Sequence, residues 1–278
     1  MISIIICSKQ GNIADELQAN IRATIGVPYE LIVIDNSDNR HSIFSAYNEG
    51  VRQATQEILC FMHEDIRYHS DDWGNHVIAH FSDSQTGMIG LAGAYCLLFV
   101  PSLWAKAKPH FKCLIQSFPD KNRPARHYRS SERPVELACV DGFWFCMRKS
   151  LFEHVSFDAG RFRHFHFYDM DISMQVRQQG YAIQGVTDIL IEHFSTGSLD
   201  ARWLEAAYLF HRKWEKELPA SVNNSPRHKP LMRLKAYRDL LYLHRKNHFP
   251  VSSETRMIGW KTLGLNIATA YLLSLFKK

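Results

Sequence analysis

The sequence of 278 residues lacks the signatures of several common protein classes. Its six cysteines include no C-x-x-C pair and lie mostly in apolar runs, which favours reduced core thiols over zinc sites or disulfides. It contains neither G-x-G-x-x-G nor G-x-x-x-x-G-K-[ST], so a dinucleotide fold and a P-loop are both disfavoured. It shows no internal repeat and no low-complexity tract.

Long apolar runs are also missing. Ile2–Cys7 is too short for the apolar core of a secretory signal, so we expect the protein to stay on the cytoplasmic side. Met257–Phe276 is largely apolar, but Lys261 and Asn266 interrupt it, and a membrane span needs about 20 nearly uninterrupted apolar residues. A helix lying in the membrane interface or on a partner, giving peripheral membrane contact, and a helix docked on the protein's own core both stay open.

The charge is mildly basic. With 46% apolar and 22% charged residues and a net charge of +5, the sequence has the composition of a folded globular protein. This charge suits an anionic substrate or a membrane surface, and it does not identify a nucleic-acid binder, so we expect no nucleic-acid partner. Basic residues crowd into 105–133 and 212–261. The stretch 101–134 is predicted to be a long basic loop, either functional or mobile.

Strand and helix patterns alternate over the first 65 residues. The apolar runs 2–7, 30–34 and 58–62 predict strands, and 12–24 and 43–54 predict helices. This order predicts an α/β fold in which right-handed crossovers build a doubly wound, mainly parallel sheet flanked by helices. In such a sheet the ligand site lies beyond the carboxyl ends of the strands.

The composition changes after Pro219. Before it, residues 200–218 predict an amphipathic helix with Asp200 as its N-cap. After it, 221–230 resembles a linker and 231–248 a basic amphipathic helix. We therefore expect a large domain over residues 1–218 and a C-terminal helical extension over 219–278.

Acidic and imidazole groups stand at the ends of several apolar runs, where a strand delivers them to one edge of a sheet. The segments are 61–66, 140–148, 167–173 and 191–198. An ionised carboxylate tolerates burial only when it is paired, hydrogen-bonded or metal-bound. The pattern therefore predicts a site for a divalent cation together with a proton acceptor.

Individual residues in these segments have a chemical and an ordinary interpretation. A carboxylate of Glu64 or Asp65 can hold Mg²⁺ or Mn²⁺, or belong to a surface cluster. Asp169 and Asp171 can include a general base whose pKa is raised by aromatic neighbours, or be ordinary acids at a helix start. A lone histidine is more often structural, so a functional role for His193 is supported only by the other motifs around it.

The order of these segments resembles the family 2 glycosyltransferases of GT-A fold. The matching motifs are Glu30–Asp38, Ala46–Gly50, Cys60–Ile66 at the D-x-D position, Val140–Phe143, Tyr168–Ile172, and Ile191–His193 followed by Gly197-Ser198. Within that family, the sequence most resembles the subgroup that includes the streptomycin-cluster glycosyltransferase-like proteins. His63 replaces the first aspartate of D-x-D, which leaves Glu64 and Asp65 as the acids there.

This resemblance implies a Rossmann-like GT-A fold with a mixed sheet, and an inverting transfer of a sugar from a nucleotide donor, with a UDP-sugar favoured. It implies Mn²⁺ or Mg²⁺ as the cofactor. The residues it assigns are Ser8, Asp35, Asn48 and Glu64 for the nucleotide, Asp65 and His193 for the metal, Asp141 and Gly142 for the acceptor, and Asp169 as the general base.

Two other functions stay open. The chain can be a GT-A-like module that binds nucleotides without turnover, or a peripheral membrane or assembly protein whose basic tail is the functional part. The acceptor is equally open among a glycan, a lipid-linked molecule and a small molecule. The basic stretch 105–133 suits an anionic or lipid-diphosphate acceptor, and a solvated surface loop is the more ordinary interpretation.

Overall fold

The computed structural model describes residues 1–119, 123–195, 199–222 and 230–262. Its N-terminal part alternates strands and helices as the sequence predicts. They are β1 (Ile2–Ser8), α1 (Asp15–Thr24), β2 (Tyr29–Asp35), α2 (Ile43–Gln53) and β3 (Ile58–Met62). β1 pairs in parallel with β2 on one side and with β3 on the other. The isoleucines of β1 are all buried, because β-branched side chains suit a strand that is covered on both faces.

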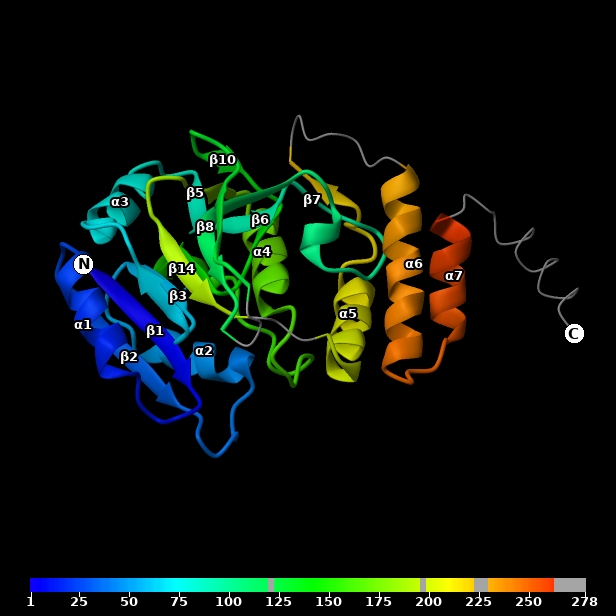
Figure 1. The fold of residues 1–278 in the computed structure, drawn as a ribbon, viewed down its shortest axis with the longest axis horizontal. Coiled ribbons are helices and arrows are strands. Elements are labelled where there is room, and N and C mark those ends of the chain that lie inside the picture. The colour runs from blue at the N-terminus through cyan, green and yellow to red at the C-terminus, as the bar shows by residue number, and fades with distance from the viewer. Residues whose placement is uncertain (120–122, 196–198, 223–229, 263–278) are drawn as a thin grey trace, which may run out of the picture.

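These strands belong to a seven-stranded sheet with the order β10-β13-β5-β12-β3-β1-β2 (Figure 1). Its other members are β5 (Thr86–Gly90), β10 (Val135–Glu136), β12 (Trp144–Arg148) and β13 (Ala182–Gly185). β1, β2, β3, β5 and β13 run in one direction, whereas β10 and β12 run in the other. The predicted mixed and mainly parallel sheet is confirmed.

A second sheet lies beside the first and has the order β11-β6-β8-β14-β4, with β9 paired to β8. Its strands are β4 (Ile66–Tyr68), β6 (Ala92–Ala94), β8 (His110–Ser117), β9 (Arg126–Arg129), β11 (Cys139–Val140) and β14 (Ile191–Phe194). The prediction of a long loop over 101–134 is wrong, because β8 and β9 form an antiparallel pair there. Pro109 and Pro119 lie just outside β8, so they bound the strand instead of breaking it.

The remaining elements cover the sheets or connect their strands. They are α3 (Trp73–His80), β7 (Cys96–Leu97), η1 (Trp104–Lys106), η2 (Lys149–Glu153), α4 (Tyr168–Gln178), α5 (Ala201–Lys213), β15 (Ala220–Ser221), α6 (Pro230–Lys246) and α7 (Ser253–Thr262). Asp200 caps α5 as predicted, since its side chain accepts a hydrogen bond from the amide of Trp203 (2.9 Å).

The C-terminal helices pack beside α5 (Figure 1). The Tyr208 hydroxyl on α5 lies 2.7 Å from His244 Nε2 on α6 and 2.7 Å from Thr255 Oγ1 on α7. The described start of the predicted helix 257–276 is therefore docked on the chain's own core, and residues 263–278 lie outside the described part. No helix among the described residues has the length and apolar character to cross a bilayer. The expected boundary after residue 218 falls just before β15, which pairs with β7.

An aromatic cluster fills the core beneath the carboxyl edge of the main sheet. The ring of Tyr47 lies 5.0 Å from that of Phe61 and 5.6 Å from that of Tyr168, and Phe145 stacks on Phe61 at 5.0 Å. Full burial of one such side chain stabilises a fold by roughly 1.5–3 kcal/mol. The cluster therefore fixes the position of Tyr168 at the start of α4. None of the six cysteines forms a disulfide, as predicted.

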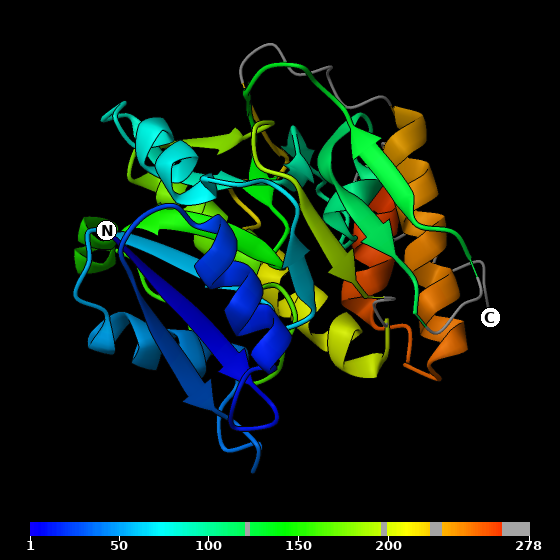
Figure 2. The same cartoon turned by 60° about the vertical axis from the view of Figure 1, so that its left-hand side comes forward.

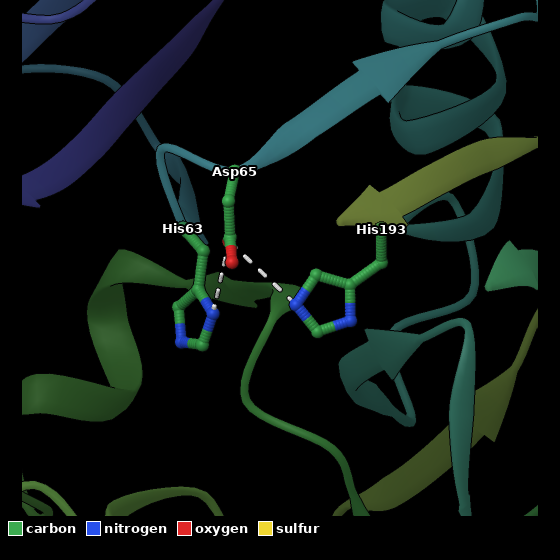
Figure 3. A group of neighbouring side chains, drawn as sticks. All are labelled: His63, Asp65 and His193. Atoms are coloured by element: carbon green, nitrogen blue, oxygen red, sulfur yellow. Dashed lines mark ion pairs between the residues drawn. The ribbon is translucent and has the colours of Figure 1, made fainter. Parts of the chain in front are cut away.

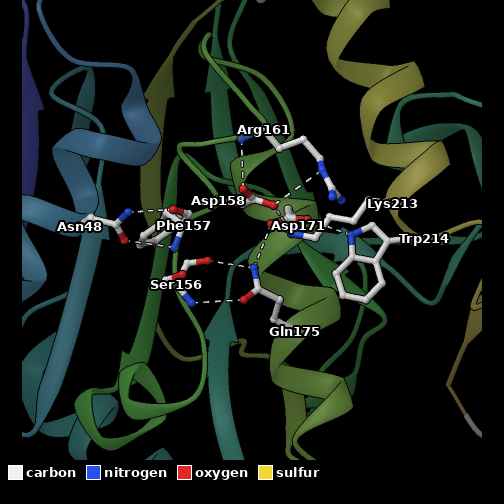
Figure 4. A network of polar contacts seen from close by, with 9 residues as sticks. All are labelled: Asn48, Ser156, Phe157, Asp158, Arg161, Asp171, Gln175, Lys213 and Trp214. Atoms are coloured by element: carbon white, nitrogen blue, oxygen red, sulfur yellow. Dashed lines mark hydrogen bonds and ion pairs between the residues drawn. The ribbon is translucent and has the colours of Figure 1, made fainter.

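A polar network fastens α4 to its neighbours (Figure 4). Asp171 is completely buried, and Lys213 Nζ lies 2.9 Å from its carboxylate and 2.8 Å from that of Asp158. Trp214 Nε1 and Gln175 Nε2 donate further hydrogen bonds to Asp171, at 2.8 and 2.9 Å. Burial raises the pKa of Asp171, against the lowering effect of Lys213. This acid holds α4 against α5.

Lys213→Met is expected to lower the free energy of unfolding by about 3–5 kcal/mol, because it leaves Asp171 buried without a cation. The loss shrinks at acidic pH, where Asp171 takes up a proton. Denaturant unfolding measures the effect. Arg212→Met is the matched control, since Arg212 is exposed and 3.7 Å from Glu254, and it is expected to cost less than about 1 kcal/mol. Equal losses in the two variants contradict the role given to Lys213.

Candidate active site

A tight turn between β3 and β4 places His63 and Asp65 beside β14 (Figure 3). The amide of His63 donates to the carbonyl of Phe143 (2.9 Å), and the amide of Phe194 donates to the carbonyl of Asp65 (2.9 Å). These backbone bonds fix both ends of the turn. β14 runs antiparallel to β4, and its register sets His193 opposite Ile66. Residues that are 130 positions apart in the sequence therefore meet at one edge of the sheet.

The three side chains surround a common point. Asp65 Oδ1 lies 3.6 Å from His63 Nδ1 and 3.6 Å from His193 Nε2, and one ligand atom of each residue lies within 4.8 Å of the others. A separation of 3.6 Å is too long for a hydrogen bond. Asp65 Oδ1 and His193 Nε2 are nevertheless buried, and neither has a hydrogen-bond partner among the described residues. Buried polar atoms without partners cost free energy, so the arrangement calls for a further group between them.

The electrostatics keep the acid of this cluster ionised. Burial by itself raises the pKa of Asp65, but His193 and His63 face the carboxylate and hold its pKa well below the ordinary value. The ring of Phe143 stacks on that of His193 at 4.6 Å and 17°, which fixes the imidazole plane. The cluster thus presents one carboxylate oxygen and two oriented imidazoles.

Hydrogen bonding also sets the tautomer of His63. The Tyr168 hydroxyl donates its proton to the carbonyl of Gly142 (2.9 Å) and lies 2.7 Å from His63 Nε2. Because the hydroxyl has one proton, it accepts from Nε2–H of His63. In the neutral ring Nδ1 then carries the lone pair, and this nitrogen faces Asp65. A partner that holds the outer ring nitrogen in this way is typical of histidines that bind metal.

The donor set fits a divalent transition-metal ion. Donor atoms that share one ion at about 2.1 Å lie roughly 3.0–3.5 Å from each other, close to the two 3.6 Å separations between Asp65 and the imidazoles. Imidazole suits transition metals, whereas carboxylate and water suit Mg²⁺. The sequence comparison identifies His63 as the replacement of the first D-x-D aspartate and does not assign it as a ligand. In the structure, however, His63 Nδ1 lies 3.6 Å from Asp65 Oδ1. The position of His63 in the D-x-D motif was the signal that could have identified it as a candidate ligand.

A cavity of about 140 Å³ adjoins the cluster and is lined by His63. Its wall also contains Trp104, Asp141, Gly142, Tyr168 and Asp169. Short contacts run along this wall from His63 through Tyr168 to the carbonyl of Gly142, while the amide of Gly142 donates to Asp169 Oδ2 (2.9 Å). His63 therefore belongs to the cluster and to the cavity at once.

Asp169 has the properties of a proton acceptor near neutral pH. Burial, and then the negative charge of Asp141, raise the pKa of Asp169 to about 7. The amides of Met170 and Gly142 donate to its two oxygens at 2.8 and 2.9 Å, and these hydrogen bonds lower the pKa. A carboxyl with such a pKa is half ionised at pH 7. Of the two predicted acids, Asp169 lines the cavity, whereas Asp171 is held by Lys213.

The start of α4 aims Asp169 into the cavity. The residue before the helix, Phe167, has a φ of 72°, a left-handed conformation that is strained for a bulky side chain. The rings of Trp203 and Phe210, each 5.4 Å away, pack against Phe167 and hold it there. Packing from α5 thus supports the backbone turn that presents the candidate base.

Asp141 and Gly142 border the same cavity, at the end of β11. Trp104 Nε1 donates to Asp141 Oδ2 (3.0 Å), and the amide of Phe143 donates to Asp141 Oδ1 (3.2 Å). A side chain at Gly142 would collide with the ring and hydroxyl of Tyr168. Glycine is therefore required where the backbone passes so close to Tyr168.

The residues predicted to bind the nucleotide divide into two groups. Ser8, Asp35 and Glu64 lie at the carboxyl ends of β1, β2 and β3, and Glu64 Oε1 accepts from the amide of Lys9 (3.4 Å). Asp35 is exposed, whereas Ser8 is buried and donates to the carbonyl of Asn12 (2.8 Å). Asn48 lies apart from them on α2.

Both polar ends of the Asn48 amide are engaged by Phe157. Nδ2 donates to the carbonyl of Phe157 (2.7 Å), and Oδ1 accepts from its amide (3.1 Å; Figure 4). These bonds fasten α2 to the segment before α4, which is a structural task. The predicted nucleotide contact of Asn48 stays a prediction. Gly197 and Ser198, which belong to the last matched motif, lie outside the described residues.

A mixed, mainly parallel sheet with this cluster at its carboxyl edge is the GT-A fold of glycosyltransferases. Residues 3–192 of the 278 match the model of the Glycosyltransferase like family, and the chain belongs to that family. No curated protein matches the sequence.

Two solved structures share the fold at low sequence identity. GalNAc-T7 with UDP, GalNAc and Mn²⁺ is 11% identical with a TM-score of 0.53, and the match covers 91% of this chain and 57% of GalNAc-T7. The chain thus spans just over half the length of that structure. The second is the mannosyltransferase PcManGT from Pyrobaculum calidifontis in complex with GDP-Man and Mn²⁺. It is 14% identical with a TM-score of 0.51, and the match covers 99% of this chain and 78% of PcManGT.

Proposed function

We propose that the chain is a metal-dependent, inverting glycosyltransferase that moves a sugar from a nucleoside diphosphate to an acceptor hydroxyl. The observation that carries the proposal is the double role of His63, which joins the Asp65–His193 cluster to the cavity of Asp169. Membership of the glycosyltransferase-like family supports it. So do the nucleotides and Mn²⁺ bound by the two structures of the same fold.

In this proposal Asp169 is the general base. Its carboxylate takes the proton of the acceptor hydroxyl while the acceptor oxygen forms a bond to the anomeric carbon and the bond from that carbon to the diphosphate breaks. A single displacement of this kind inverts the anomeric carbon. Asp141 and Gly142 position the acceptor, and a base with a pKa near the working pH is the most effective.

His63, Asp65 and His193 would hold the cation. When bound there, it supplies positive charge where negative charge develops on the leaving diphosphate. Because two of the three donors are imidazoles, we propose Mn²⁺ before Mg²⁺. Asp65, which stays ionised, provides the negative charge that attracts the cation.

The nucleoside is proposed to bind at the ends of β1 and β2, near Ser8, Asp35 and Glu64. A UDP-sugar donor, action on the cytoplasmic side, and membership of the streptomycin-cluster subgroup stay predictions from the sequence.

Thermal unfolding in the presence of nucleotides tests the proposal. UDP, GDP or one of their sugars at 100 times its dissociation constant is expected to stabilise the protein by about 2.7 kcal/mol with Mn²⁺ present, and much less without metal. Indifference to every nucleotide overturns the proposal. Nucleotide binding without transfer or hydrolysis in a broad donor screen favours the alternative of a binding module without turnover.

Asp141→Asn is expected to shift the acid limb of the pH profile to lower pH. Asp169 must be ionised to accept a proton, so kcat/KM rises with pH through its pKa of about 7. Removal of the Asp141 charge lowers that pKa. Rates from about pH 5 to pH 9 measure the shift, with the exposed Asp38→Asn as the control for loss of one negative charge. An unmoved midpoint contradicts the coupling of the two acids.

A further inference from the structure

The β8–β9 pair continues the wall of the site beyond His193. The register sets His193 of β14 opposite Gln116 of β8, and Gln116 opposite Arg126 of β9. Directly paired residues of neighbouring strands project from the same face of a sheet. Gln116 Nε2 donates to the carbonyl of His193 (3.0 Å), so the two are in contact. Arg126 therefore stands on the face of the metal cluster, two strands away.

Lys112 occupies the same face, four residues before Gln116 on β8. Its Nζ lies 4.8 Å from the ring centroid of Tyr128 and 5.7 Å from that of Trp104. Tyr128 is two residues after Arg126 on β9 and therefore lies on the same face. Trp104 in turn lines the cavity of Asp169 and donates to Asp141. The face with Lys112 and Arg126 thus extends from the cluster to the candidate acceptor cavity.

The positive charge on this face is not neutralised by described residues. Arg126 is exposed and Lys112 half-buried, and neither forms an ion pair with a described carboxylate. On the opposite face of β9, by contrast, Arg129 pairs with Glu132 at 3.0 Å. The pKa of His110 at the start of β8 is lowered by burial and then by Lys112 and Lys108, which agrees with a positive local potential.

The position of this face separates it from the nucleoside. β3 is followed by β1 and β2 in the main sheet, and the ends of β1 and β2 carry Ser8 and Asp35. β4 is followed by β14, β8 and β9 in the second sheet, so the turn between β3 and β4 separates the two sets of strands (Figure 2). A diphosphate held at the cluster with its nucleoside toward β1 and β2 has its sugar and the acceptor on the side of β8 and β9. Positive side chains on β8 and β9 therefore act on the acceptor and not on the nucleoside.

We propose that Lys112 and Arg126 form an anion-binding subsite for the acceptor. The acceptor is then a molecule that bears a phosphate or carboxylate group close to the hydroxyl that receives the sugar. Lys112 is oriented by Tyr128 and Trp104, and Arg126 supplies a planar donor pair for an oxyanion. The assignment rests on the proposed function, since it needs a sugar acceptor in the Asp169 cavity.

Calorimetric titration of the protein with UDP or GDP and Mn²⁺ tests the subsite. Glucose 6-phosphate and glucuronate, each compared with glucose, are the probes, and they distinguish phosphate from carboxylate. At least one anionic sugar is expected to bind where glucose does not. Lys112→Gln and Arg126→Gln should weaken that binding at least about tenfold. Arg129→Gln, on the same strand but the opposite face, is the matched control and should change it less than about twofold.

Three results overturn the subsite. The first is that anionic sugars bind no better than glucose, and the second is that Arg129→Gln loses as much affinity for the anionic sugar as Lys112→Gln and Arg126→Gln. The third is a parallel loss of nucleotide affinity in Arg126→Gln, which would mean that Arg126 contacts the donor. The failure of the proposed function looks different. A protein that binds nucleotide with Mn²⁺ but no anionic sugar removes the subsite alone. A protein that binds no nucleotide removes the proposed function and, with it, the acceptor role.

Discussion

Asp169→Asn is expected to lower kcat about 10²–10⁴-fold and to leave the affinity for nucleotide and Mn²⁺ within about threefold of the unchanged protein. The amide keeps the size of the carboxylate but cannot take a proton from the acceptor hydroxyl. Asp169 lines the acceptor cavity and is separated from the metal cluster by Tyr168, so binding of the donor does not depend on it. Initial rates and nucleotide titrations measure the two effects. Transfer within tenfold of the unchanged protein rules out Asp169 as the base.

Stability gives the control for this variant. The folded pKa of Asp169 lies above the ordinary value of 3.8, so the folded state holds the extra proton and loses stability as pH rises from about 4 through 7. Asparagine removes that loss, and the variant should be no less stable than the unchanged protein at pH 8. Asp171→Asn should instead unfold more easily, because it removes one of the two carboxylates that pair with Lys213. Two acids that are two residues apart thus give opposite results.

The residue pattern by itself does not distinguish these two acids, and only the family resemblance assigns Asp169 as the base. Both belong to one motif at the start of one helix, and either can be raised in pKa by burial. The distinction depends on Lys213 and Trp214, about forty positions later, which reach Asp171 from the end of α5. The strands β1 to β3 were predictable, because their apolar runs and turn residues are local signals. Partners from distant segments are not local, so the different surroundings of Asp169 and Asp171 appear only in the fold.

The same reason explains His63 and the β8–β9 pair. The orientation of the His63 ring depends on Tyr168, which contacts Nε2 from another segment. The strand character of β8 is hidden by flanking prolines and basic residues, and it becomes clear when β14 and β9 supply its hydrogen bonds. In contrast, Asp65 and His193 were predicted to share one site, because residues at the carboxyl edge of a sheet converge whatever their separation in sequence.

Asp65→Asn is expected to weaken Mn²⁺ binding by at least about 100-fold, measured without nucleotide from the spectrum of free Mn²⁺. The asparagine lacks the negative charge that pairs with the cation, and two neutral imidazoles alone hold Mn²⁺ poorly. Glu64→Gln is the matched control at the next residue. Its carboxylate faces the amide of Lys9 instead of the cluster, so Mn²⁺ affinity should change less than about threefold.

His63→Asp then tests the donor set itself. A second carboxylate in place of an imidazole should raise the affinity for Mg²⁺ relative to Mn²⁺, because hard oxygen ligands suit Mg²⁺. The variant also loses the contact with Tyr168, which orients the ring but carries no ligand. An unchanged preference between the two ions would mean that His63 Nδ1 does not reach the metal. Unchanged Mn²⁺ binding in Asp65→Asn would remove the cation from this site altogether, because Asp65 is the one acid whose oxygen faces both imidazoles among the described residues.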